Sequence, residues 1–304
     1  MKKVRLIEVG LRDGLQNEKI NLSVEHRLEL INQLVGAGVE NFEIGAFVSP
    51  KWVPQMACTE DLVIQYNKKY KSVKKLQPSV LVPNEIGLEK AISHQLGEIA
   101  IFASCSESFS QKNINCSISE SFERFEKIVK LAQKNNQQYK IKVRGYLSVC
   151  FGCPYDGLID EKKVVQLAKK LIDIGCYEVS IGDTIGIAHV GQVESLFKKL
   201  MKVIPVKKLA GHFHDTRGQA LANILAAYKL GIRTFDSSIG GLGGCPYARG
   251  ATGNVATEDV VYMFHGMGIQ TQLNLAQLIK TNAWLSQAMG KELPSKVARV
   301  ENLK

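Results

Sequence analysis

The sequence predicts an α/β protein built as a (β/α)₈ (TIM) barrel. Strand-like apolar runs alternate with amphipathic helical stretches from one end of the 304-residue chain to the other. Several helical stretches close on a glycine, as at Gly38, Gly175 and Gly231, which is typical of helix C-termini. No linker or shift of composition interrupts the alternation. A series of eight strand–helix units without a break favours a closed parallel barrel.

The expected elements follow one another in order along the chain. Eight short apolar segments are the expected strands: residues 4–9, 41–46, 80–82, 98–103, 140–148, 178–181, 209–214 and 234–238. Segments with apolar residues at a spacing of about 3.6 are the expected helices: residues 24–37, 59–68, 85–94, 119–135, 161–174, 190–202 and 217–230. A doubly wound sheet is the alternative fold. It is disfavoured because no Gly-x-Gly-x-x-Gly follows the first strand and the chain has no P-loop.

We expect residues 1–304 to form a single domain. The barrel should occupy about residues 1–240, and a glycine-rich loop after the eighth strand with additional C-terminal helices should occupy about residues 240–304. With 45% hydrophobic and 22% charged residues, the composition is that of an ordinary globular protein.

Composition and charge argue against several classes of partner. No apolar stretch approaches the roughly 20 residues that a membrane span requires. The net charge of +10 comes from lysines spread over polar helix faces without interleaved aromatic residues, so we expect no nucleic-acid partner. A basic surface instead attracts a small anionic substrate. The N-terminus enters a strand-like run without a targeting segment, so we expect a cytoplasmic protein.

The seven cysteines are scattered and odd in number, which fits reduced thiols rather than a disulfide framework. Cys150 and Cys153 have the spacing of a redox or zinc pair. No second pair is available to complete four zinc ligands, and no thioredoxin-like context surrounds the motif. We therefore expect these two cysteines to be structural.

Two histidines at the end of the seventh expected strand are the first candidate site. His212 and His214 stand at positions i and i+2, so they point to the same side of the strand while Phe213 faces the other. Two convergent imidazoles provide half of a divalent metal site. The alternative is a pair of core histidines satisfied by hydrogen bonds.

Further polar residues gather at the same rim of the predicted barrel. Arg12 and Asp13 follow the first strand, and Glu43 lies in the second. Asp13 in a turn could simply accept backbone hydrogen bonds. Facing two histidines at the carboxyl ends of the strands, it instead becomes a carboxylate metal ligand. Arg12 beside it can hold an anionic group or a developing enolate.

A glycine-rich loop follows the eighth strand and carries Cys245 at its centre. Glycines let the backbone approach a ligand closely, and a thiol on such a loop is a candidate proton shuttle or nucleophile. The alternative is an unreactive cysteine. Asn254, at the end of the loop, offers a side-chain oxygen to the metal. Oxygen and imidazole ligands favour Mg²⁺ or Mn²⁺ over a thiolate-rich zinc site.

These motifs together resemble the 3-hydroxy-3-methylglutaryl-CoA lyases, members of a metal-dependent TIM-barrel superfamily that also holds the isopropylmalate and homocitrate synthases. The resemblance extends over nearly the whole chain. The segments that carry it include Val9-Gly-Leu-Arg-Asp-Gly-Leu-Gln-Asn-Glu18, Phe47-Val-Ser-Pro-Lys-Trp-Val-Pro-Gln-Met56, Gly211-His-Phe-His-Asp-Thr-Arg217 and Gly253-Asn-Val-Ala-Thr-Glu-Asp259. The loop Gly-Leu-Gly-Gly-Cys-Pro-Tyr-Ala points to the lyases, because the synthases lack its cysteine.

The resemblance implies a role for each candidate residue. It implies metal ligation by Asp13, His212, His214 and Asn254, substrate contact and enolate stabilisation by Arg12, and a catalytic thiol at Cys245. His212 or Asp13 would act as the base. Glu43 matches an acid near the family site, Ser106 a polar residue that binds substrate, and Cys153 a family cysteine.

The implied reaction is the cleavage of (S)-3-hydroxy-3-methylglutaryl-CoA to acetoacetate and acetyl-CoA, as in leucine breakdown or ketone-body metabolism. The implied partners are an acyl-CoA substrate and, as is common in the family, a second copy of the chain. A related lyase for another 3-hydroxyacyl-CoA, or an acetyl-CoA-condensing synthase, is the alternative enzyme. A non-catalytic metal- or CoA-binding barrel is the alternative outside catalysis.

Overall fold

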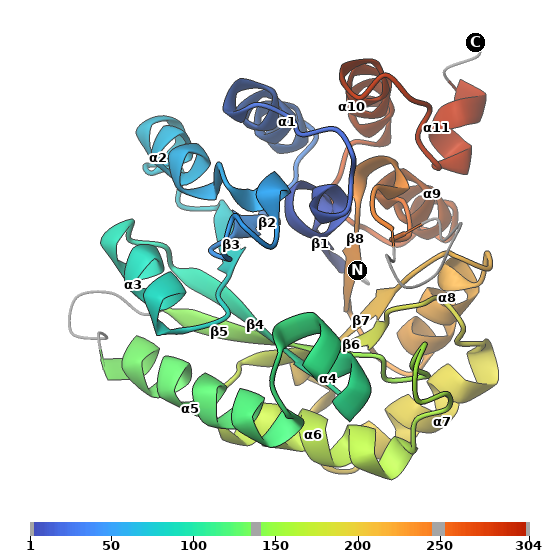
Figure 1. Cartoon of the computed structure of the whole chain (residues 1–304). Coiled ribbons are helices and arrows are strands. Elements are labelled where there is room, and N and C mark those ends of the chain that lie inside the picture. Colours follow the sequence, from blue (N-terminus) through green and yellow to red (C-terminus); the bar gives the residue numbers. More distant parts are fainter. Residues whose placement is uncertain (1–2, 135–140, 245–252, 302–304) are drawn as a thin grey trace.

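The computed structural model describes residues 3–134, 141–244 and 253–301. Its eight strands form one closed barrel in which each strand is parallel to its neighbours and β1 pairs with β8 (Figure 1). The strands are β1 (Arg5–Glu8), β2 (Asn41–Ala46), β3 (Gln77–Leu81), β4 (Glu98–Ser104), β5 (Lys142–Ser148), β6 (Glu178–Asp183), β7 (Leu209–Phe213) and β8 (Thr234–Ser237). The predicted TIM barrel is confirmed, and the doubly wound sheet is excluded.

Helices surround the barrel, and most of them follow a strand (Figure 1). They are α1 (Val24–Gly36), α2 (Thr59–Tyr70), α3 (Glu85–Ser93), α4 (Glu107–Ile114), α5 (Ile118–Lys134), α6 (Glu161–Asp173), α7 (Val190–Leu200), α8 (Ala220–Lys229), α9 (Thr257–Gly266), α10 (Leu275–Ala288) and α11 (Lys296–Glu301). The last three are the predicted additional C-terminal helices. Helix α4 was not predicted.

Side-chain caps fix where several helices begin. Ser23, Asn84, Ser106, Asp160 and Asn274 each accept a hydrogen bond from a backbone N–H in the first turn of the helix that follows. Such caps satisfy donors that have no partner inside the helix. The caps therefore determine the residue at which each of these helices begins.

The C-terminal part of the chain contacts its N-terminal part. Helix α10 packs against α1 and α9. The backbone N–H of Val4 donates to the carbonyl of Gln270, and that of Asn274 donates to the carbonyl of Ala37. The segment between α9 and α10 is thus bound to the residue before β1 and to the end of α1. No helix among the described segments combines the length and the apolar character needed to traverse a bilayer.

Candidate metal centre

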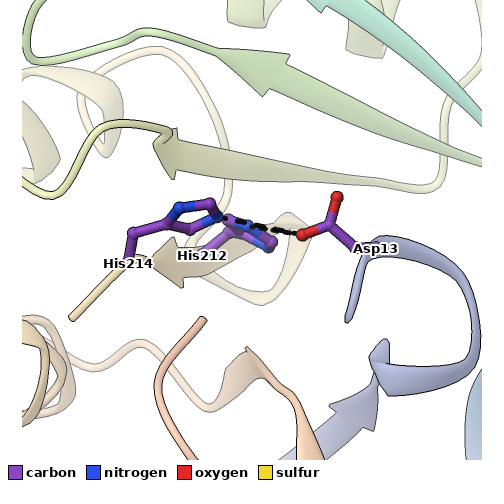
Figure 2. Close-up of side chains that lie close together, drawn as sticks. All are labelled: Asp13, His212 and His214. Atoms are coloured by element: carbon purple, nitrogen blue, oxygen red, sulfur yellow. Dashed lines mark ion pairs between the residues drawn. The ribbon is translucent and has the colours of Figure 1, made fainter. Parts of the chain in front are cut away.

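Asp13, which follows β1, and His212 and His214, at the end of β7, point toward one another, as Figure 2 shows. The Oδ2 atom of Asp13 lies 3.9 Å from Nε2 of His212 and 3.8 Å from Nε2 of His214. The donor atoms of all three side chains lie within 4.8 Å of one another. Two oxygen or nitrogen ligands of one small divalent cation lie up to about 4.2 Å apart, twice a bond of about 2.1 Å. The two distances from Asp13 to the imidazoles, 3.9 and 3.8 Å, are within this limit, so the carboxylate can share a divalent metal ion with either ring.

A tight turn after β1 places Asp13. Residues Gly10–Gly14 form a short π-helical turn, and the backbone N–H of Gly10 donates to Glu8 Oε1 at 2.8 Å. A Cβ atom at Gly10 would lie 2.6 Å from that oxygen, so a larger residue there would displace the Glu8 carboxylate. The same Glu8 oxygen accepts the N–H of Ile239, which links the turn to the chain beyond β8.

Arg12 lies between two carboxylates. Its Nη1 donates to Asp13 Oδ1 at 2.7 Å, and its Nε donates to Glu43 Oε2 at 2.6 Å. Its guanidinium also lies 5.4 Å from the centre of the Tyr146 ring. Burial alone would raise the pKa of Asp13, but the charge of Arg12 and the nearby histidines hold that pKa well below its usual value. Asp13 is therefore ionised at neutral pH, as a metal ligand must be.

Glu43 contacts Arg12 rather than the imidazoles. It is fully buried, and its Oε1 has no hydrogen-bond partner among the described residues. Burial raises the pKa of Glu43, although the positive charge of Arg12 opposes the change. The structure thus places Glu43 beside Arg12, and Arg12 in turn contacts the metal donor Asp13.

The histidine pair comes from β7, as predicted. His212 lies in the strand and His214 directly follows it, with 5.2 Å between their ring centres. Phe213 faces the other way and packs against Phe151. The Nδ1 atom of His212 lies 3.1 Å from Asp236 Oδ2. Burial alone would lower the pKa of His212, but the hydrogen bond and charge of Asp236 raise it.

Asn254 lies beside the cluster. It forms an isolated bridge with His214, and its Nδ2 donates to Asp13 Oδ2 at 2.8 Å and to the carbonyl of Leu242 at 3.2 Å. A half-turn of the amide would present Oδ1 at the same place. The structure thus places Asn254 beside Asp13, with its amide nitrogen rather than its oxygen towards that carboxylate.

Cys245 lies outside the described residues, but both stems of its loop are placed. The carbonyl of Gly244 accepts a hydrogen bond from Asn17 Nδ2 at 2.9 Å. At the other stem, a Cβ atom on Gly253 would lie 2.2 Å from the carbonyl carbon of Gly243. The two stems therefore meet next to Asn254, on the side of the barrel that carries the metal donors.

Ser106 and the cysteines form a separate group beyond β4 and β5. The hydroxyl of Ser106 donates to Asp156 Oδ2 at 2.5 Å. Cys153 Sγ lies 3.0 Å from the same Ser106 hydroxyl oxygen. Cys150 instead lies 3.9 Å from Cys105. Cys150 and Cys153 therefore have different neighbours. Among the contacts of the described residues, Ser106 has none with the metal donors.

Sequence reasoning missed several buried charged residues near the site. They are Glu8, Arg144, Asp183, Asp236 and Glu258, each no more than 1% exposed. Four of them lie in barrel strands. Charged residues are unusual inside buried parallel strands. That exception to the apolar pattern was the signal available in the sequence.

Comparison with known proteins identifies the relatives of this chain. The family model described as HMGL-like matches residues 3–285. The chain belongs to the HMGL-like family. A curated relative from Pseudomonas aeruginosa, named 3-hydroxy-3-isohexenylglutaryl-CoA/hydroxy-methylglutaryl-CoA lyase, is 47% identical over 298 residues, or 98% of this chain and 97% of the relative.

Solved structures of HMGL-like proteins superpose closely on the chain. A hydroxymethylglutaryl-CoA lyase from Pseudomonas aeruginosa matches with a TM-score of 0.94 and 46% identity, covering 99% of this chain and 98% of the other. An HMG-CoA lyase from Acinetobacter baumannii, in complex with coenzyme A and 3-methylmalate, matches with a TM-score of 0.90 and 34% identity, covering 98% and 94%.

Proposed function

We propose that this protein is a metal-dependent carbon–carbon lyase that cleaves (S)-3-hydroxy-3-methylglutaryl-CoA to acetoacetate and acetyl-CoA. The single observation that supports it most is the convergence of Asp13, His212 and His214 beside a buried Arg12, in a chain 47% identical to a hydroxymethylglutaryl-CoA lyase. A carboxylate and two imidazoles at a barrel rim suit a hydroxy acid that chelates a cation.

We propose Asp13, His212, His214 and Asn254 as the residues that hold the cation, with Mg²⁺ or Mn²⁺ as its identity. When bound, such an ion supplies Lewis acidity to the tertiary hydroxyl and the free carboxylate of the substrate. Asn254 would contribute its side-chain oxygen after the half-turn of its amide. Its hydrogen bond to Asp13 already keeps it next to the other donors.

The chain's own residues account for the proton transfers and for the developing charge. The hydroxyl proton moves to a base, the C2–C3 bond breaks, and its electron pair becomes the enolate of acetyl-CoA. Arg12 stabilises this enolate, because its buried guanidinium is held rigidly by two carboxylates. Cys245 then delivers the proton that converts the enolate to acetyl-CoA. The base releases the proton that it took up, and the thiolate regains one, so both groups return to their starting states.

Asp13 is our choice of base over His212. Both nitrogens of a ligating His212 are engaged, Nδ1 with Asp236 and Nε2 towards the other donors. Such a ring has no lone pair free to accept a proton. Asp13 retains Oδ1, which accepts from Arg12 and has further lone-pair capacity. Because the pKa of Asp13 is held low, this role requires a bound cation to lower the pKa of the substrate hydroxyl as well. Glu43 is assigned to holding Arg12, and Ser106 to substrate contact.

An assay of acetoacetate release from the thioester, with and without added Mg²⁺ or Mn²⁺, tests the function directly. We expect metal-dependent release. Two further arms separate the alternatives: 3-hydroxy-3-isohexenylglutaryl-CoA as substrate, and condensation of acetyl-CoA with a 2-keto acid. A protein that performs only the condensation, or that has no activity in any arm, would contradict the proposal.

We also infer that the protein works on an acyl-CoA as a cytoplasmic homodimer, in leucine degradation or ketone-body metabolism. The net charge of +10 favours the approach of an anionic CoA ester. Light scattering on the purified protein tests the dimer, and a single-chain mass would exclude it.

A further inference from the structure

A row of buried charged side chains leads through the barrel interior to His212. Arg144 Nε donates to Glu178 Oε1 at 2.9 Å, and Arg144 Nη2 lies 2.8 Å from Asp236 Oδ1. Asp236 Oδ2 in turn lies 3.1 Å from His212 Nδ1. Arg5 contributes a further ion pair with Glu178 at the amino-terminal end of the strands. The row thus connects β1, β6, β5 and β8 to the histidine on β7.

Burying this row of charged side chains is unfavourable in free energy. Removing each charge from water costs several kcal/mol, and apolar side chains of similar volume often fill such positions with equal or greater stability. The carboxylate that meets His212 therefore calls for a role beyond packing.

The two histidines of the metal centre differ in the hydrogen-bond partner of the ring nitrogen Nδ1. Nδ1 of His214 has no hydrogen-bond partner within the described segments. Nδ1 of His212, in contrast, faces a carboxylate that is held from two other sides. Ser180 Oγ donates to Asp236 Oδ2 at 2.6 Å, and Arg144 lies against Oδ1. Among the described residues, a carboxylate therefore faces Nδ1 of His212 but not Nδ1 of His214.

The position of Asp236 determines which nitrogen of His212 is free. A neutral imidazole carries one proton, and an ionised carboxylate can only accept a hydrogen bond. The proton of His212 therefore resides on Nδ1, towards Asp236. The lone pair is then on Nε2, the atom that lies 3.9 Å from Asp13 Oδ2 in the metal cluster. A carboxylate behind a metal-bound histidine fixes the tautomer and the ring orientation in this way.

We propose that Asp236 is a positioning residue of the metal centre, which holds His212 with its Nε2 lone pair towards the cation, and that Arg144 holds Asp236 in place. This inference rests on the proposed function, because it requires His212 to be a metal ligand. It adds to that function a residue that does not itself touch the cation or the substrate.

The test compares Mn²⁺ binding to the parent protein and to Asp236→Asn, by electron paramagnetic resonance of free Mn²⁺ and without substrate. Asparagine preserves the size of the side chain, but its amide can donate to Nδ1 and so favours the opposite tautomer. We expect the dissociation constant for Mn²⁺ to rise about 10- to 100-fold. An unchanged affinity in folded Asp236→Asn would overturn the inference.

Glu178→Gln is the matched control. It breaks the buried ion pair with the same Arg144, and the ion pair with Arg5, but leaves the contact between Asp236 and His212 in place. We expect it to lower the melting temperature and to change Mn²⁺ affinity by less than about twofold. If Glu178→Gln weakens Mn²⁺ binding as much as Asp236→Asn does, the effect belongs to the whole ion-pair row and the specific role of Asp236 is refuted.

A second measurement does not depend on whether Asp236→Asn folds. Long-range ¹H–¹⁵N correlation spectra of the Mg²⁺-loaded parent protein report which nitrogen of His212 carries the proton. We expect the proton on Nδ1, whereas a proton on Nε2 would overturn the inference.

The outcomes separate this inference from the proposed function. A parent that binds Mn²⁺ and an Asp236→Asn variant that binds it weakly support the inference, even if no acetoacetate is released and the lyase proposal fails. Parent-like binding by Asp236→Asn overturns the inference and leaves the lyase proposal intact. A parent protein that binds no divalent cation overturns both.

Discussion

Arg12 shows how much one side chain contributes to this site. It is only 6% exposed and bridges carboxylates from two different strand ends, Asp13 after β1 and Glu43 in β2. Two of its donor nitrogens act at once, in directions that only a planar, forked guanidinium offers. The residue thereby orients a proposed metal ligand and keeps a positive charge next to it.

Arg12→Lys should therefore strongly reduce activity, although it keeps the positive charge. A lysine ammonium cannot donate to Asp13 and Glu43 in the same geometry, so we expect kcat to fall by about 10²- to 10³-fold. Steady-state assays of acetoacetate release measure the effect. Arg299→Lys, at an exposed position on helix α11, is the control that should retain parent activity. A loss of less than about threefold in Arg12→Lys would contradict this role.

Cys245→Ala tests the proposed proton donor. We expect most of the turnover to be lost while the melting temperature changes by no more than about 2 °C, since the substitution removes a thiol and no part of the barrel. Cys58→Ala, a half-buried free cysteine on another loop, is the matched control and should keep its activity. Full activity in Cys245→Ala would refute the catalytic assignment.

The residues that sequence alone could identify are those whose pattern is local. His212 lies in one strand and His214 directly follows it, and Arg12 and Asp13 share one turn, so their spacing indicated a site. Asp236 could not be interpreted in the same way, because its partners Arg144 and His212 come from other strands. Its role depends on barrel closure, which brings β8 beside β7 and β1.

At the scale of elements, the turn after β1 links local backbone geometry to the site. Gly10→Ala would place a Cβ atom 2.6 Å from Glu8 Oε1, which must then move away from the N–H groups it accepts. We expect a loss of about 1–3 kcal/mol in the free energy of unfolding, together with weaker metal binding through displacement of Asp13.

Gly36→Ala is the control for that substitution. Gly36 ends helix α1, and no atom lies within 4 Å of a Cβ placed there. We expect it to be neutral or to stabilise the protein by up to about 1 kcal/mol. Urea unfolding of both variants measures the difference. Equal stabilities for the two alanine variants would show that the contact with Glu8 is unimportant.

The strands and the longer helices were predictable because each repeats a clear apolar pattern. The expected strand 41–46 matches β2, while β3 begins at Gln77, earlier than the expected residue 80. The polar start of β3 is paired with β2, and this tertiary contact overrides the sequence pattern. Helix α4 was missed because its eight residues include few apolar ones. Its start depends on the cap that Ser106 provides.

At the scale of the whole molecule, two buried acids make stability depend on pH. Burial raises the pKa of Glu258 to about 8 and that of Glu8 to about 7, in spite of the hydrogen bonds that each accepts. Between the unfolded value of 4.5 and these values, the folded protein holds protons that the unfolded chain releases. The stabilisation is therefore complete below pH 4.5 and is lost as the pH rises towards 8.

We accordingly expect the free energy of unfolding to fall between pH 5 and pH 8, by on the order of 1–4 kcal/mol for Glu258. Glu258→Gln removes this titration and keeps an amide of similar shape, so its stability should change less over the same range. Urea unfolding at several pH values compares the two proteins. Parallel curves for parent and variant would contradict the shift.

Metal binding should also stabilise the whole chain, because the proposed ligands come from both the start and the end of the barrel. At a free Mg²⁺ or Mn²⁺ concentration of about 100 times the dissociation constant, we expect about 2.7 kcal/mol of added stability. Thermal melting with metal and with a chelator measures it. His214→Ala should show little of this difference, and an equal shift in that variant would rule out the site.

Closure of the barrel has a consequence for synthesis on the ribosome. β1 hydrogen-bonds on one side to β2 and on the other to β8, more than 200 residues later in the sequence. At about 5–20 residues per second, the ribosome takes roughly 10 to 50 seconds to reach that second partner. Throughout this interval the nascent chain exposes an open strand edge, which is a template for aggregation. We therefore expect productive folding in the cell to depend on chaperones that shield this edge until the last third of the chain has emerged.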